Sequence, residues 1–583
     1  MKVLLTAVNA KYIHSNLAVY SLKASAGAWK DQIVIREFTI NQSIQHILER
    51  LYMEEADVIC FSCYIWNIRM IMELGELMGR IRPDIRIWLG GPEVSFDAKE
   101  RLESCGWLEG VMCGEGEETF AELMDAFNGK RPIDTVDGIT FRDGEGNIVE
   151  RARRDYVDMD QLPFVYSHMD GFEHKIIYYE SSRGCPFSCS YCLSSVEKKV
   201  RFRDTQEVKK ELQQFIDWEV PQVKFVDRTF NCDRKHAMEI LRYIKEHDRG
   251  KTNFHFEITA DLLTEEEMDF MAGLRPGLIQ LEIGVQSTNP RTLKEIRRWV
   301  SFEKLGKVVR RINGGHNIHQ HLDLIAGLPY EDMESFRKSF NDVYALEPEQ
   351  LQLGFLKVLK GSHMRERAGD YGLVYDPNPP YEVLGTKWIS YKDLVELKGI
   401  EAVLEVYYNS RQFENSIRWL EHYFDTPYDM YQALAGWYRE HGLNEVSQSR
   451  MDRYDILLDF ASAVIKDEGA VQDMKQLLIY DLYLRENLKK RPEWAADQSE
   501  HKGFYTGFFG DASNRQRYVP AYAGYTAKQI QRMTHMEYFT FDVEATAAAG
   551  KPSGTGGYVL FDYKQRDPLT YRSRVEKIEV DGR

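Results

Sequence analysis

The first 130 residues alternate between short apolar runs and amphipathic stretches. The apolar runs have the length of buried strands, and the stretches between them repeat apolar residues at the spacing of a helix. The runs lie at residues 3–8, 33–38, 58–63, 85–91 and 110–114, and helical patterns lie at 17–26, 44–53, 67–81 and 117–128. This alternation predicts a doubly wound parallel sheet, which binds ligands at the carboxyl ends of its strands.

A second alternating unit follows a connector at residues 131–170, where a hairpin is predicted around a turn at 143–146. Apolar runs lie at 176–181, 223–227, 254–258, 279–284, 321–327 and 351–358, with helical patterns at 204–218, 233–248, 264–274, 289–313 and 333–346. Six strands with intervening helices predict a partial (β/α)6 barrel over residues 171–390. Periodicity alone does not distinguish this barrel from a second open sheet.

The pattern changes after residue 390. Three amphipathic helical stretches follow, IRWLEHYF, YDILLDFASAVI and MKQLLIYDLYLRENLKK. Near the end, EYFTFDV and YVLFDY flank the turn-forming KPSGTGG and predict a hairpin. We therefore expect residues 391–583 to form a mainly helical accessory or substrate-binding region that ends in a hairpin.

Composition narrows the class of protein. The chain of 583 residues is 43% hydrophobic, which supports large packed cores, and no apolar run is long enough to cross a membrane. The first residues predict a buried strand and not an export signal, so we expect a cytoplasmic protein. The net charge of −16 argues against a chain-wide surface for nucleic acid. Clustered cysteines in a reducing compartment indicate metal binding or catalysis.

Three of the eight cysteines are grouped in RGCPFSCSYC, as Cys185, Cys189 and Cys192. They follow the first strand of the second unit, which in a barrel is the end where chemistry takes place. Three thiolates can bind three irons of a [4Fe–4S] cluster and leave the fourth iron open. A zinc site needs a fourth ligand, for which Cys232 is the nearest spare cysteine. Three buried structural cysteines are the remaining alternative.

The CxxxCxxC spacing, with Tyr191 before the last cysteine, resembles the signature of the radical S-adenosylmethionine (SAM) superfamily. The resemblance implies that the open iron binds the amino and carboxylate groups of SAM. Residues 227–231 resemble the family's segment near the SAM amino group, and HLDLIAGLP (321–329) resembles its segment near the adenine. The resemblance assigns further SAM-site residues, which are Asp227, Thr229, Asn231, Glu257, Glu282 and Gln286. For the two glutamates, ordinary strand-end carboxylates are the alternative.

The loops after the strands of the first unit lie where a doubly wound sheet binds a ligand, which indicates a second site. A GxGxxG fingerprint is missing after the first strand, which disfavours a dinucleotide site. In front of a radical SAM core, GGPEVS and GEGE resemble segments of a cobalamin-binding domain. The resemblance places the cofactor at Asn9, Tyr12, His14, Ser15, Asn16, Ser62, Gly90, Gly91, Glu93, Gly114, Glu115 and Gly116. The DxHxxG motif is absent, as is typical of this class. For His14 two roles are open, which are cobalt ligation and hydrogen bonding.

The combined resemblance is to an uncharacterised subgroup of cobalamin-binding radical SAM enzymes with an extra C-terminal domain. It implies methylation of an unactivated substrate carbon, using methylcobalamin, a 5′-deoxyadenosyl radical and electrons from a flavodoxin- or ferredoxin-type donor. A non-methylating cyclisation or rearrangement is the alternative within enzymes, and a non-catalytic cobalamin or redox sensor is the alternative outside them. A small-molecule or peptide substrate is expected, and its identity is open.

Overall fold

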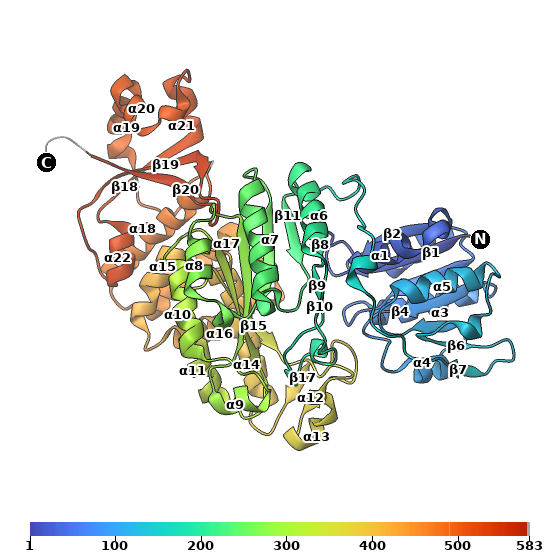
Figure 1. Cartoon of the computed structure of the whole chain (residues 1–583). Helices are drawn as coiled ribbons and strands as arrows, with labels where there is room; N and C mark the ends of the chain where they lie inside the picture. The colour runs from blue at the N-terminus through green and yellow to red at the C-terminus, as the bar shows by residue number, and fades with distance from the viewer. Residues whose placement is uncertain (489, 580–583) are drawn as a thin grey trace.

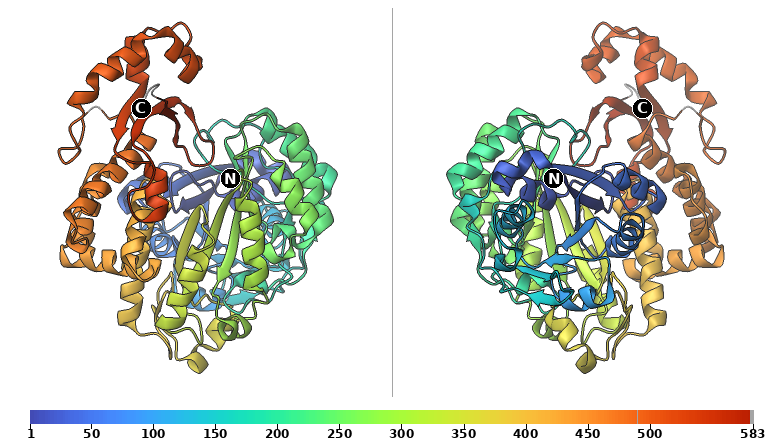
Figure 2. Two further views of the ribbon diagram at one scale, coloured as in Figure 1. Left: turned by 90° about the vertical axis from the view of Figure 1, so that its left-hand side faces the viewer. Right: turned by 90° about the vertical axis from the view of Figure 1, so that its right-hand side faces the viewer.

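The computed structural model describes residues 1–488 and 490–579, which form an N-terminal sheet domain, a central barrel-like domain and a C-terminal region (Figure 1). The N-terminal domain lies beside the first strand of the central domain, and the C-terminal region packs on its other side (Figures 1 and 2). No helix among the described residues is long and apolar enough to cross a membrane.

The N-terminal sheet has the strand order β2-β1-β3-β4-β5-β6-β7, in which the first five strands are parallel. Successive residues of β1 pack into cores on opposite faces, since Leu4 joins one cluster and Leu5 the other. Burial on both faces explains the continuous apolar runs in the sequence. The elements are β1 (Val3–Asn9), α1 (Leu17–Ser25), β2 (Ile33–Thr39), α2 (Ile44–Tyr52), β3 (Val58–Ser62), α3 (Ile68–Ile81), β4 (Arg86–Gly90), α4 (Ala98–Ser104), β5 (Gly110–Met112) and α5 (Glu117–Phe127). The predicted doubly wound sheet is confirmed.

The hairpin expected in the connector is present and extends this sheet. Its strands β6 (Ile139–Arg142) and β7 (Ile148–Glu150) pair antiparallel, and β6 pairs antiparallel with β5. Asp143 closes the turn by accepting bonds from the backbone N–H groups of Glu145 and Asn147. Part of the predicted connector is therefore an edge of the N-terminal sheet.

The central sheet has six parallel strands in the order β15-β14-β13-β12-β11-β8. Because the order follows the sequence and the two end strands do not pair, the sheet is a partial barrel. Its strands are β8 (Ile177–Tyr179), β11 (Gln222–Phe225), β12 (Asn253–Ile258), β13 (Ile279–Gln286), β14 (His319–Ala326) and β15 (Gln350–Phe355). Its main helices are α6 (Thr205–Asp217), α7 (Arg234–His247), α8 (Glu265–Ala272) and α11 (Met333–Tyr344).

One predicted helix, at residues 289–313, is wrong as a single element. The structure has α9 (Pro290–Glu295) and α10 (Phe302–Asn313), separated by an irregular segment. Arg297 in that segment has φ +57°, a left-handed conformation that stops a helix. The side chain of Ser301 then caps α10 by accepting a bond from the N–H of Lys304. The prediction failed because the apolar periodicity of the sequence continues across this break, which the local backbone conformation imposes.

The C-terminal region is mainly helical, as predicted. Most of it shares a hydrophobic core with the barrel, and a second, smaller core forms around Phe508, Tyr522 and Leu560. It ends in an antiparallel sheet of three strands, β18 (Thr534–Phe539), β19 (Gly557–Arg566) and β20 (Ser573–Ile578). The connection between β18 and β19, where the hairpin was predicted, contains a short helix, α22 (Val543–Ala549). The hairpin with the shorter connection is β19–β20. The remaining helices include α14 (Tyr391–Leu404), α15 (Glu414–Leu420), α16 (Pro427–Glu440), α17 (Arg450–Val464), α18 (Glu468–Arg485), α19 (Lys502–Gly510), α20 (Ala512–Tyr518) and α21 (Ala527–Met533).

Candidate active site

The three clustered cysteines lie on the loop between β9 (Ser182–Arg183) and β10 (Arg201–Phe202), just beyond the carboxyl end of β8. Cys185 and Cys189 are buried, Cys192 is partly buried, and none of the three forms a disulfide. Gly184 has φ +91°, and a Cβ atom there would lie 2.4 Å from the carbonyl oxygen of Lys199. The glycine before the first cysteine is therefore needed for the two sides of the loop to approach.

Backbone hydrogen bonds hold the loop in place from three directions. The N–H of Cys185 donates to the carbonyl of Glu197 at 3.1 Å, and the N–H of Ser190 donates to Ile296 at 2.9 Å. The carbonyl of Ser190 accepts a bond from the N–H of Met364 at 2.8 Å. The segment between α9 and α10 thus helps to hold the cysteine loop in place.

Arg298 is a site residue that the sequence analysis missed. Its Nη1 atom lies 4.0 Å from the sulfur of Cys189, and its Nη2 atom donates to the carbonyl of Gly284. Burial raises the pKa of the Cys189 thiol, and the charge of Arg298 opposes that shift. An arginine beside the thiols favours their thiolate form, which is the form that binds iron. No sequence signal distinguished Arg298 from its basic neighbours, because its place depends on the helix break.

Tyr191 and Thr229 lie next to the cysteines. The Thr229 hydroxyl is 3.6 Å from the Cys185 sulfur, and burial raises the pKa of the Tyr191 phenol. Two other residues of this segment have structural partners instead. Asp227 accepts bonds from the hydroxyl groups of Ser181, at 2.6 Å, and Ser182, at 2.7 Å, and Asn231 pairs with the backbone of Thr259.

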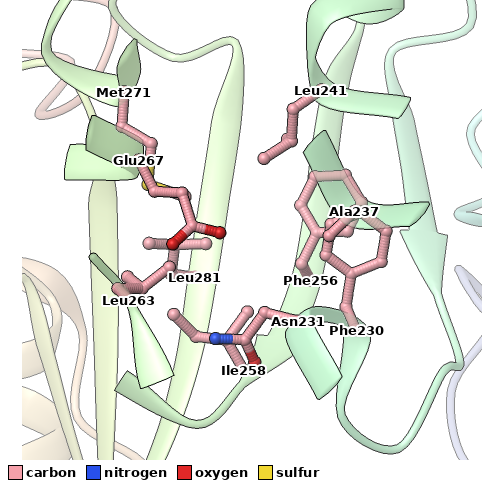
Figure 3. A pocket seen from close by; sticks show the side chains of 10 residues that line it. All are labelled: Phe230, Asn231, Ala237, Leu241, Phe256, Ile258, Leu263, Glu267, Met271 and Leu281. Atoms are coloured by element: carbon pink, nitrogen blue, oxygen red, sulfur yellow. The ribbon is translucent and has the colours of Figure 1, made fainter. Parts of the chain in front are cut away.

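The side chains of Phe230 and Asn231 border a small cavity of about 10 Å³ in the barrel wall (Figure 3). Its other walls are mostly apolar and include Phe256, Leu263 and Leu281. A volume of this size is at the lower limit for a single water molecule. The cavity is therefore a packing defect of the core, and Phe230 belongs to that core.

The thiol set fits an iron–sulfur cluster. Among the described residues no three His, Cys, Asp or Glu side chains converge on a point where they would hold a metal ion. A zinc site requires such convergence, whereas each cysteine of a [4Fe–4S] cluster binds a different iron. Three unpaired thiols on one loop, beside the cation of Arg298, are the donor set that such a cluster needs.

Glu257 and Glu282 lie on the face of the central sheet that the helices do not cover. Burial raises the pKa of Glu257 to about 7, and no hydrogen bond to its carboxyl group is formed within the described chain. Glu282 lies in the middle of β13, 2.9 Å from Lys224 Nζ and 3.0 Å from His255 Nε2. Burial alone would raise the pKa of Glu282, but these two partners hold it well below its usual range. Glu282 is thus part of a charged layer inside the barrel.

Gln286 closes the same strand at its carboxyl end. Its φ of +71° accompanies a bulge between β13 and β14, and its side-chain oxygen is buried without a hydrogen-bond partner. A strained residue with an unsatisfied polar atom at a strand end is a typical ligand contact. Its placement is consistent with the SAM-site assignment.

At the carboxyl edge of the N-terminal sheet, the loop after β1 is bonded internally and to the barrel. Asn16 caps α1 and its amide lies 3.3 Å from the hydroxyl of Ser62, while Asn9 donates to the carbonyl of His14. The hydroxyl of Ser15 donates to the carbonyl of Ile176 in the barrel domain. The structure thus brings these residues together at one edge of the sheet.

His14 shares a 2.6 Å hydrogen bond between its Nδ1 atom and the hydroxyl of Tyr178 on β8. Burial and the charges of Lys11 and Lys224 lower the pKa of His14, so the neutral ring is favoured. The hydrogen-bonding role weighed against cobalt ligation is therefore present in the structure. Tyr12, by contrast, is 69% exposed.

The glycines of this edge differ in their surroundings. Gly91 has φ +113°, and a Cβ atom there would lie 2.6 Å from the carbonyl oxygen of Cys63, so the loops after β3 and β4 could not meet. Gly114 has φ +87° and open space around the position of a Cβ atom. Gly90 packs near Met112, and Gly116 caps α5 beside Leu22. The backbone of Gly114 is therefore open on the side where a side chain would lie.

The two glutamates assigned to cobalamin have protein partners across the domain boundary. Glu93 is buried and lies 3.0 Å from Lys360 Nζ and 3.3 Å from Arg101, and it accepts a bond from the hydroxyl of Tyr381. Glu115 forms a two-point ion pair with Arg201. Their side chains join the domains, which sequence alone could not show, because Arg201, Lys360 and Tyr381 are 86 to 288 residues away from them.

Comparison with known families finds three matches in succession along the chain. Residues 3–124 match the B12 binding domain, and residues 179–343 match the radical SAM superfamily. The chain thus carries a B12-binding domain followed by a radical SAM domain. Its cofactors are accordingly a [4Fe–4S] cluster, SAM and cobalamin. Residues 369–561 match a family described as a protein of unknown function (DUF4080).

This radical SAM protein is 27% identical over 357 residues to the cobalamin-dependent radical SAM methyltransferase TokK of Streptomyces tokunonensis, covering 56% of this chain and 51% of TokK. It is 21% identical over 368 residues to an anaerobic magnesium-protoporphyrin IX monomethyl ester cyclase of Rubrivivax gelatinosus, covering 60% and 65% of the two chains. This chain thus spans about half to two thirds of the length of these relatives.

Among solved structures, the cobalamin-dependent SAM radical enzyme OxsB with aqua-cobalamin and SAM bound has a similar fold. The TM-score is 0.53 at 17% identity, and the match covers 82% of this chain and 79% of OxsB. The similarity supports an architecture in which a cobalamin-type sheet domain is fused to a partial barrel.

Proposed function

We propose that this protein methylates an unactivated carbon of a small or peptide substrate, using SAM and cobalamin. The observation that supports the proposal best is one ion pair. Arg183, two residues before Cys185, lies 2.6 Å from Glu117 in the first turn of α5. This pair joins the residue beside the cysteine loop to the edge of the N-terminal sheet, and it supports a substrate position between the two cofactor sites.

When bound, the cluster with SAM supplies hydrogen abstraction, and cobalamin supplies the methyl group. The chain supplies the thiols of Cys185, Cys189 and Cys192 as cluster ligands, with Arg298 favouring their thiolate form. Gly114 leaves backbone space for the larger cofactor at the sheet edge. A flavodoxin- or ferredoxin-type donor is proposed as the source of electrons.

The proposal is tested by incubating the anaerobically reconstituted full chain with SAM, reductant, cobalamin and candidate substrates. Production of S-adenosylhomocysteine together with 5′-deoxyadenosine supports methylation. In Cys189→Ala we expect loss of iron and of SAM cleavage, with cobalamin still bound. Cys232→Ala is the matched control and should keep its iron, because that cysteine belongs to a different loop. Loss of cobalamin from folded Cys189→Ala would contradict the two-site arrangement.

Cyclisation without methylation is a second candidate, favoured by the similarity to the Rubrivivax cyclase. The same incubation separates the two, because a cyclase forms 5′-deoxyadenosine without S-adenosylhomocysteine. Absence of SAM cleavage in fully reconstituted protein would contradict both candidates and support a sensor.

A further inference from the structure

Four arginines converge where the C-terminal region meets the barrel. They come from three separate segments, since Arg411 precedes α15, Arg485 ends α18, and Arg566 and Arg572 flank the tip of the β19–β20 hairpin. Bonds from Arg485 to the carbonyls of Thr570 and Arg411, and from Arg566 to that of Arg485, join them. We call Arg411, Arg485, Arg566 and Arg572 the arginine cluster.

The arginine cluster lies at the amino ends of the barrel strands, away from the cysteines. Asn409, two residues before Arg411, accepts a 2.9 Å bond from the N–H of Leu351 near the start of β15. The hairpin tip lies against Gly277, just before β13, where a Cβ atom would be 3.6 Å from the carbonyl of Pro568. In Figure 1, β19 and β20 accordingly lie at the opposite end of the barrel from α9. The cluster is separate from the cofactor sites.

Few carboxylates form ion pairs with these arginines. Within the described chain, Glu414 is the one carboxylate that forms ion pairs with the cluster. It contacts Arg411 at 2.9 Å, Arg485 at 3.8 Å and also Arg572. Asp481 is near Arg485, but its carboxyl oxygens accept bonds from Asn415 and Ser416. Three guanidinium groups therefore share one carboxylate, and the fourth, Arg566, donates to the carbonyls of Tyr571 and Arg485 and lies over the ring of Tyr563.

The donors of the cluster are incompletely used. The Nε atom of Arg572 is buried and has no hydrogen-bond partner, although the Arg572 side chain as a whole is 35% exposed. Burial and the charge of Arg411 lower the pKa of Arg572 to about 10, and burial lowers that of Arg485 to about 10. Burial is the first cause of both shifts, and at Arg485 the charge of Asp481 opposes it.

We propose that the arginine cluster is a binding site for a phosphate-type oxyanion. Guanidinium groups present pairs of N–H donors whose spacing matches two oxygens of a phosphate, and a doubly charged anion would offset the excess of cations. The exposure of Arg566 and Arg572 gives the anion a path from solvent. The inference does not depend on the reaction proposed above, because it uses no residue of the cofactor sites.

The test measures inorganic phosphate binding to the full chain by calorimetry and by the shift in melting temperature, with chloride at equal ionic strength as reference. We expect saturable stabilisation by phosphate and at least tenfold weaker binding in Arg572→Gln. Arg574→Gln is the matched control, because Arg574 lies on the same β20 strand but pairs with Glu576 and Gln565. That control should bind phosphate like the wild type.

Glu414→Gln distinguishes a binding site from a purely structural cluster. Removing the internal carboxylate should tighten phosphate binding several-fold, a gain that misfolding would not produce. Methyl phosphate separates two sources of the anion, since its binding indicates a phosphate carried on an organic molecule, and its exclusion indicates the free ion. No phosphate-specific stabilisation of the wild type, equal affinity in Arg572→Gln, or no tightening in Glu414→Gln would each overturn the proposal.

Discussion

Glu331 is a buried carboxyl group whose ionisation costs stability. It is fully buried, its Oε1 atom accepts bonds from Ser287 at 2.6 Å and Ser339 at 3.0 Å, and its Oε2 atom has no partner. Burial raises its pKa from 4.5 to about 7. The native state therefore binds its proton more tightly than the unfolded chain does between these two pH values, and stability falls as pH rises through that window.

We predict that Glu331→Gln has the same free energy of unfolding as the wild type near pH 4.5. Between pH 4.5 and about pH 7 the variant should become more stable than the wild type, by at most about 3 kcal/mol. Above pH 7 the difference should stay constant, because both states of the wild type are then ionised. Melting temperatures over this range measure it. The exposed Glu334→Gln in the next turn should change the melting temperature little at each pH. A difference between Glu331→Gln and wild type that does not vary with pH would refute the shift.

At the same scale, the sequence predicted individual site residues better than the residues that contact them. The cysteines, Gly91 and Gly114 could be recognised locally, because spacing and conformational freedom are properties of the chain. Arg298 could not be, because its approach to Cys189 depends on the irregular segment after α9.

The cysteine loop is an element whose shape depends on one backbone conformation. Gly184 has φ +91° and faces the carbonyl of Lys199 across the β9–β10 pair. We predict that Gly184→Ala displaces the loop and lowers iron content after reconstitution several-fold, because an alanine there is both strained and in collision. Iron analysis and the visible absorption of the cluster measure this.

Gly144→Ala is the control for that substitution, since Gly144 has open space around it in an exposed turn. It should keep its iron. Full iron loading of Gly184→Ala would show that the loop tolerates a side chain at this position.

At the scale of the whole molecule, Glu93 joins the N-terminal domain to the barrel. Its carboxylate is 2% exposed and is shared by Arg101, Lys360 and Tyr381. We predict that Glu93→Gln destabilises the protein by about 2–3 kcal/mol, because two mostly buried cations lose a partner and Asp97 compensates only in part. Denaturant unfolding of the full chain measures the change.

Glu76→Gln removes a comparable charge from an exposed pair with Arg80 on the same domain. It should alter stability by less than about 0.5 kcal/mol. Equal effects of the two substitutions would mean that Glu93 does not stabilise the domain boundary.

The sequence by itself determined the doubly wound sheet, the six-stranded partial barrel, the cysteine motif and the family resemblance. Those features depend on periodicity and spacing within short segments, where local chemistry is decisive. Tertiary structure alone decided that Glu93 and Glu115 join domains, that Arg298 reaches Cys189, and that four arginines meet at the barrel's far end. Such contacts join residues that are distant in the chain, so only the packing of whole elements can bring them together.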